Sequence, residues 1–126
     1  MKPKRSFSKP ILAAIRDGKI LGLRAGTKPH RVIGIWVVVV EGRVFVRSYT
    51  LKPRSWWRTF RNEPRGIIEV NGRKIKVRPV STRSERLKKA VDRAYAEKYN
   101  TPGSLVYVKG FKQKKRRDTT TELVPL

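Results

Sequence analysis

The chain has no cysteine, almost no histidine and few acidic residues. Its 126 residues include one histidine, His30, and nine aspartates plus glutamates. The absence of cysteine excludes disulfides, thiolate metal sites and cysteine nucleophiles. A single histidine argues against a histidine-based metal site. We therefore predict no metal centre.

The few acids are also poorly arranged for catalysis. Asp17, Glu41, Glu63 and Glu69 lie in predicted turns or beside basic residues. No two of them are spaced to act as a general acid and base. Ser48 lacks a credible histidine partner that could activate it, and no Walker-type loop or dinucleotide fingerprint is present. We predict no catalytic residues in this chain.

Long apolar runs are missing as well. The longest, at residues 32–40, is too short to cross a bilayer as a helix. The basic N-terminus is not followed by the apolar segment of a signal peptide, so we expect a cytoplasmic protein. The length fits one domain, which we place at residues 8–126 after a basic arm at residues 1–7.

Positive charge is abundant. The chain has 32 lysines plus arginines and a net charge of +23. Such an excess costs folding free energy through self-repulsion and attracts polyanions. It can serve solubility or adaptation to a salty cytoplasm. It can also indicate a polyanionic partner, namely nucleic acid, a ribosome or a multiply anionic cofactor.

Hydrophobic patterns and turn signals predict an antiparallel barrel with one long helix. Strands are expected at residues 19–25, 32–40, 43–49, 66–70, 73–80, 105–111 and 119–124. Short helices should follow Ser8 and Ser55, each of which can act as an N-cap. The strand at residues 32–40 is apolar on both faces, so a helix or a second subunit must cover one of them.

Two further signals define the second half of the chain. Asn71-Gly72 predicts a tight hairpin, because both turn positions need positive φ. Residues 82–85 have the form of a capping box, with Thr82 and Glu85 at its ends, and open the long helix that runs to Asn100. Pro102-Gly103 should break that helix, and residues 112–117 should form a basic hairpin tip.

Residues 35–49 resemble the "piWvV-x-dG-x-lyvRS" hairpin of split-barrel proteins related to pyridoxamine-phosphate oxidase. Residues 56–58 and 66–68, 94–99 and 119–125 are similar to that group's "W-y-R…G-r-i", "AYraKY" and "TT-x-x-L-x-P" segments. The closest match is a small uncharacterised family of split-barrel proteins. Residues 53–64 and 69–73 resemble deazaflavin-dependent nitroreductases more loosely.

The resemblance implies a fold that is mainly β (α+β): a six-stranded antiparallel split β-barrel with one long helix and short flanking helices. It also implies a homodimer that binds a flavin, such as FMN, or a deazaflavin at the subunit interface. With such a cofactor the protein could be a redox enzyme. The end of the strand at Arg47-Ser48 should hold the cofactor phosphate. The candidate cofactor-binding residues are Arg47, Ser48, Tyr49, Lys52, Arg54, Trp56, Trp57 and Arg58.

The residue types suit these roles. An arginine offers a planar fork of donors to a phosphate and a serine offers a short hydroxyl donor. Tryptophan can stack on a flavin ring or a nucleobase. Trp36 lies in mid-strand and is expected in the core, and of Trp56 and Trp57 one should face the core and the other the pocket. The alternative for the cations is a solvated basic loop.

The competing hypothesis is a non-enzymatic protein that binds nucleic acid or the ribosome through its basic surface. No helix-turn-helix, zinc spacing or RNP signature accompanies the charge. Such binding would weaken steeply with salt, because each neutralised phosphate releases counterions. The alternative is that the basic tip at residues 112–117 is merely solvated and binds no partner. The candidate residues are Lys2, Lys4, Arg5, Lys112, Lys114, Lys115, Arg116 and Arg117.

Overall fold

The computed structural model describes residues 6–28 and 31–126. In chain order the elements are α1 (Lys9–Asp17), β1 (Leu21–Ala25), β2 (Ile33–Ile35), β3 (Val38–Val40), β4 (Arg43–Val46), α2 (Trp56–Asn62), β5 (Gly66–Val70), β6 (Arg73–Ser81), α3 (Glu85–Lys98), α4 (Pro102–Phe111), α5 (Lys114–Arg117) and β7 (Thr121–Pro125). None of the helices in these ranges is long and apolar enough to cross a membrane.

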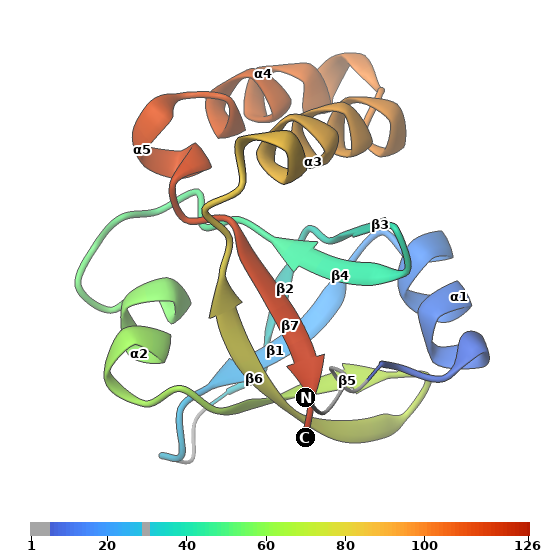
Figure 1. The fold of residues 1–126 in the computed structure, drawn as a ribbon, viewed down its shortest axis with the longest axis vertical. Coiled ribbons are helices and arrows are strands. Elements are labelled where there is room, and N and C mark those ends of the chain that lie inside the picture. Colours follow the sequence, from blue (N-terminus) through green and yellow to red (C-terminus); the bar gives the residue numbers. More distant parts are fainter. Residues whose placement is uncertain (1–5, 29–30) are drawn as a thin grey trace.

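All seven strands form one antiparallel sheet in the order β2-β1-β5-β6-β7-β4-β3. β2 and β3 therefore lie at opposite edges although only Trp36 and Val37 separate them in the chain. The three Cα–Cα steps from Ile35 to Val38 span about 11 Å at most, so the edges must approach each other. The sheet consequently curls into a half-barrel (Figure 1), which confirms a mixed α+β fold with a curled antiparallel sheet.

The single strand predicted at residues 32–40 is wrong, because the structure divides this segment into two strands, β2 and β3. Val38 belongs to the cluster under the helices, whereas Val37 packs in the barrel interior. α3 packs against β3, so a helix supplies the cover that this apolar segment needs. Residues 6–28 and 31–126 contain seven strands rather than the six implied by the family resemblance.

The segment at residues 105–111 is a second correction, because it forms helix α4 instead of a strand. Pro102 stands in the first turn of α4 after Thr101, where a missing N–H costs nothing. The proline thus starts a helix rather than only ending one. Val108 and Phe111, one turn apart, are buried in the second core cluster, and this packing outweighs the strand preference of the β-branched and aromatic residues.

Two further predictions about the same half of the chain are wrong in detail. The basic segment at residues 112–117 is not a hairpin tip, since Lys114–Arg117 form α5. The long helix begins after Ser84, whose side chain accepts a hydrogen bond from the Leu87 N–H. Thr82 is not its cap, because its N–H donates to the Thr120 carbonyl.

Local signals elsewhere are confirmed. Ser8 and Ser55 cap α1 and α2 through their side chains. Asn71 and Gly72 have φ of 51° and 73°, as a tight hairpin between β5 and β6 requires. Phe7, placed in the predicted basic arm, is instead buried in the core.

Two apolar clusters lie on the two faces of β4. Val44 and Val46 point into the half-barrel with Leu23, Ile68 and Leu123. Phe45 points the other way, toward the layer of α3, α4 and α5 seen above the sheet in Figure 1. The helical layer therefore completes a second core on the outer face.

Gly66 on β5 permits close approach of β1. A Cβ at this position would lie 2.6 Å from the Arg24 carbonyl oxygen and 3.2 Å from the Ala25 Cα. Because both are backbone atoms in a central strand pair, we expect Gly66→Ala to destabilise the protein by about 1–3 kcal/mol. Urea unfolding measures this effect.

Gly103 in α4 provides the matched control, because a Cβ there meets nothing within 4 Å. We expect Gly103→Ala to stabilise the protein by about 0.5–1 kcal/mol, since alanine prefers the helix and restricts the unfolded chain. Equal stability of the two variants would contradict the close β1–β5 contact.

Candidate functional site

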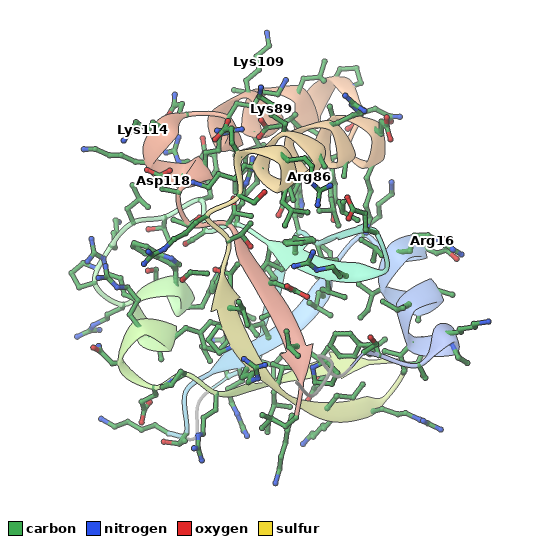
Figure 2. All side chains as sticks on the ribbon, in the orientation of Figure 1. Arg16, Arg86, Lys89, Lys109, Lys114 and Asp118 are labelled. Carbon is green, nitrogen blue, oxygen red and sulfur yellow. The ribbon has the colours of Figure 1, made fainter. Side chains whose placement is uncertain are left out.

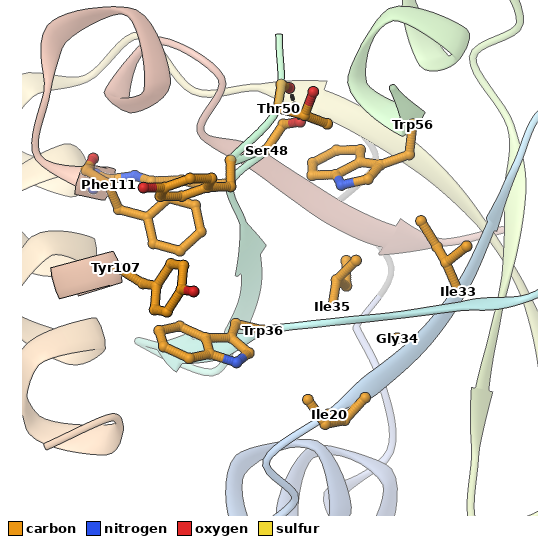
Figure 3. Close-up of a pocket in the computed structure, with 12 residues that line it drawn as sticks. Ile20, Ile33, Gly34, Ile35, Trp36, Ser48, Thr50, Trp56, Tyr107 and Phe111 are labelled. Carbon is orange, nitrogen blue, oxygen red and sulfur yellow. Dashed lines mark hydrogen bonds between the residues drawn. The ribbon is translucent and has the colours of Figure 1, made fainter. Parts of the chain in front are cut away.

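The main cavity, with a volume of about 480 Å³, lies between the β2 edge of the sheet and α4. Its walls are mostly apolar and aromatic, and Figure 3 shows the side chains pointing into the space from several elements. The lining residues are Ile20, Ile33, Gly34, Ile35, Trp36, Arg47, Ser48, Tyr49, Thr50, Trp56, Tyr107 and Phe111.

Trp36 forms one wall and is held by α3. Its ring stacks on Tyr99 with the centroids 4.0 Å apart and the planes 4° from parallel. The Tyr99 hydroxyl accepts a hydrogen bond from the Val37 N–H at 3.0 Å and donates to the Lys19 carbonyl at 2.6 Å. Burial raises the pKa of Tyr99 to about 12, so this donor stays protonated. Trp36 was predicted in the core, but it is half-buried and faces the cavity.

Tyr49 is positioned from the opposite side. The Arg116 guanidinium lies over its ring at 3.9 Å from the centroid, and Arg116 Nε donates to the Tyr49 carbonyl at 2.7 Å. A Cβ on Gly110 would lie 2.8 Å from Tyr49 Cε2, so the glycine lets the ring rest on α4. Tyr107 and Phe111 meet this ring edge to face.

Ser48 lies at the base of the cavity with its polar atoms already used. Its N–H donates to Thr119 Oγ1 at 2.8 Å. Its hydroxyl donates to the Thr50 carbonyl, the dashed line in Figure 3. A ligand could accept a hydrogen bond from the Ser48 hydroxyl only if the bond to the Thr50 carbonyl were broken.

Arg47 requires the main correction at the site. Its side chain is fully buried and lies between the sheet and the helical layer. The guanidinium donates to Thr120 Oγ1, to the carbonyls of Phe111 and Lys88, and to Asp92. Burial lowers the pKa of Arg47, and Asp92 opposes that shift. An arginine so enclosed is a structural group and does not suit an external phosphate.

This interior ion pair extends to the surface. Asp92 also accepts a hydrogen bond from Arg117 Nε at 3.0 Å, and Arg117 pairs with Glu85. The hydrogen bond that Arg117 donates to Glu85 is the first cause of the raised pKa of Arg117. The Arg47-Ser48 sequence at this strand end therefore joins α3 and α4 to the segment that leads into β7.

The other predicted cofactor residues divide between two places. Trp56 lines the main cavity, whereas Trp57 packs against the core with Arg58 and Arg61 near its ring. Arg54 lines a smaller neighbouring cavity. Arg58 donates through Nε to the Leu51 carbonyl, and Lys52 is exposed without lining either cavity. Four of the eight predicted residues thus meet at the main cavity: Arg47, Ser48, Tyr49 and Trp56.

Sequence reasoning missed most of the apolar lining. Ile20, Ile33 and Tyr107 are 59%, 41% and 48% exposed, and they come from three distant segments. The apolar side chains at these positions follow the same patterns as core residues. Tyr107, a tyrosine in an apolar segment, could have indicated a ligand site. That segment was predicted to be a strand, so the side chain was not considered.

The basic residues proposed for nucleic-acid binding are also separated. Lys112, Lys114 and Lys115 are exposed near α5. Arg116 and Arg117 are engaged with Tyr49 and Asp92, and Lys2, Lys4 and Arg5 lie outside the described residues. Figure 2 shows Lys89, Lys109 and Lys114 projecting from the helical layer.

The half-barrel and its helical layer define a mixed α+β fold with a curled antiparallel sheet and an aromatic cavity at the sheet edge. A family model covering residues 11–123 matches the chain, which belongs to the DUF2255 family, described as an uncharacterised protein conserved in bacteria. No curated protein sequence matches it.

Two solved structures share the fold. A conserved hypothetical protein from Mycobacterium tuberculosis is 14% identical with a TM-score of 0.58, covering 100% of this chain and 84% of its own. A FAD-binding protein from Mesorhizobium loti is 12% identical with a TM-score of 0.56, covering 99% of this chain and 93% of its own. At such identities the likeness concerns the fold.

Proposed function

We propose that this protein binds a flavin-type cofactor, either a flavin such as FMN or a deazaflavin, with the ring in the main cavity. The carrying observation is an apolar, aromatic cavity of about 480 Å³, within the range typical of small-molecule sites. The FAD-binding name of the Mesorhizobium loti protein supports the same ligand class.

The walls suit a planar ring. Trp36, Tyr107 and Trp56 present aromatic surface to the cavity from the β2–β3 crossover, α4 and α2. Such a ring would gain from stacking and from burial of its apolar area. The bound cofactor would supply any redox chemistry, while these residues would hold its ring and exclude water.

Addition of FMN, FAD, riboflavin or a deazaflavin to the purified protein tests this proposal. Stacking on the aromatic walls is expected to quench ligand fluorescence and shift ligand absorbance, with micromolar or tighter affinity. Absence of binding by all four at micromolar concentrations would refute it.

We also propose that a second copy of the chain covers the cavity. Ile20, Ile33 and Tyr107 line the cavity and are exposed, and Leu105 and Val106, on the same helix α4 as Tyr107, are 44% and 63% exposed. So much adjoining apolar surface is typical of an interaction site. Sedimentation analysis is expected to show a dimer, and a monomer at micromolar concentration would contradict this.

Nucleic-acid binding is the second candidate function, favoured by the net charge of +23. Lys109, Lys112 and Lys115 are exposed at one end of the helical layer. If they bind phosphates, replacing all three with glutamine should lower RNA affinity and reduce its dependence on salt. Fluorescence anisotropy with a labelled oligonucleotide measures both. Salt-independent or negligible RNA and DNA binding by the unmodified protein would remove this candidate.

A further inference from the structure

A second cavity of about 270 Å³ adjoins the first. Ile33 and Trp56 line both cavities, so the two spaces share a wall at these side chains. In Figure 3, Ile33 and Trp56 lie on the side of the main cavity away from Tyr107 and Phe111. A ligand whose ring occupies the main cavity could therefore extend past Trp56 into the second one.

The two cavities differ in charge. Among the described residues that line the main cavity, Arg47 alone is charged, and its guanidinium is buried among protein acceptors. The second cavity is lined by Lys28 and Arg54, which are both exposed. In the part of the chain that the structure describes, neither of these cations makes an ion pair.

Glu63 is the carboxylate that lines the second cavity in the described part of the chain, and its oxygens already accept hydrogen bonds. The Thr27 hydroxyl donates to Glu63 Oε1 at 2.7 Å and the Thr27 N–H to Oε2 at 3.3 Å. These bonds, followed by the charge of Lys28, lower the pKa of Glu63. The carboxylate thus ties the loop at Thr27 to the end of α2 and leaves Arg54 available for an anion.

We propose that the second cavity binds the phosphate of an elongated ligand through Lys28 and Arg54, with the ligand's planar ring in the main cavity. This inference rests on the proposed cofactor function and specifies its ligand as a phosphate-bearing one. It moves the phosphate from Arg47-Ser48 to cations that the β1–β2 loop and the segment before α2 bring together. Arginine and lysine both form charge-assisted hydrogen bonds with phosphate oxygens.

Riboflavin and FMN are the test pair, because they share a ring and differ by one phosphate. If the ring site prefers deazaflavins, the corresponding deazaflavin nucleoside and nucleotide replace them. The variants are Lys28→Gln, Arg54→Gln and the double variant. Arg73→Gln is the control, since it removes an equal charge from the exposed β5–β6 turn.

We expect the unmodified protein to bind FMN more tightly than riboflavin. Each single variant should weaken FMN binding by about tenfold, as loss of a charge-assisted bond predicts, and should leave riboflavin binding unchanged. Arg73→Gln should change neither affinity. FAD carries a bridging diphosphate, whereas FMN carries a terminal phosphate, so titration with FAD shows which of these groups the site accepts. A similar loss of FAD affinity in the variants would mean that the site binds both.

Three results would overturn the inference. Equal affinity of the unmodified protein for riboflavin and FMN would remove the phosphate contact while leaving the ring site intact. An FMN preference that survives in the double variant would place the phosphate elsewhere. Failure of every flavin and deazaflavin to bind would refute the proposed function, and the inference with it.

Discussion

Arg47→Met is expected to destabilise the protein by about 3–5 kcal/mol, because it removes the four hydrogen bonds of a fully buried guanidinium and leaves the half-buried Asp92 carboxylate to Arg117. The side chain is fully buried and bonds to Asp92, Thr120 and the carbonyls of Lys88 and Phe111. Chemical denaturation monitored by tryptophan fluorescence measures the change. A double variant that also carries Asp92→Asn should recover part of the loss, since it removes the carboxylate charge that Arg47 no longer neutralises.

Arg86→Met is the matched control. Arg86 pairs with Glu41 on the surface, where the two side chains are 66% and 48% exposed. Exposed pairs contribute roughly 0–1 kcal/mol, so this variant should unfold nearly like the unmodified protein. If Arg47→Met were as mild, and instead abolished flavin binding, the phosphate role first predicted for Arg47 would be correct.

Ile33→Glu is expected to lower flavin affinity by on the order of 100-fold, because it introduces a carboxylate into an apolar ligand site. Ile33 lines both cavities and is 41% exposed in the protein itself. The new charge can therefore remain hydrated in the absence of ligand, and the free energy of unfolding should change by no more than about 0.5 kcal/mol. Fluorescence titration with FMN measures the affinity.

Leu126→Glu controls for the added negative charge. Leu126 is 51% exposed and lines neither cavity. This variant should bind FMN as the unmodified protein does. Equal affinity of Ile33→Glu and Leu126→Glu would mean that the ring does not occupy the space beside Ile33.

Several arginines that were predicted to form a free basic surface have structural partners in the fold. Arg116 and Arg117 looked like members of a free basic tip, but they hold Tyr49 and Asp92 in place. Arg43 likewise pairs with Glu122 across β4 and β7. Part of the positive excess is therefore structural, and the cations available to an anion are fewer than the net charge indicates.

Local sequence patterns determined the elements whose geometry depends on neighbouring residues. Ser8 and Ser55 satisfy the first free N–H groups of their helices. Asn71-Gly72 adopts positive φ, and the alternation of Lys74, Lys76 and Arg78 with apolar residues gives β6 one exposed face. Each of these choices is decided within a few residues, which is why the sequence sufficed.

Tertiary structure alone decided the rest. Residues 105–111 are helical because Val108 and Phe111 pack beneath α4 against α3, a contact that no short window contains. The cavity exists because the chain crosses between sheet edges at Trp36 and Val37 and so brings β2 near α4. Arg47 binds inside the protein rather than outside because Asp92, 45 positions away in the chain, meets it there. Sequence determined that Arg47 ends a strand, and only the fold determined the direction in which its charge points.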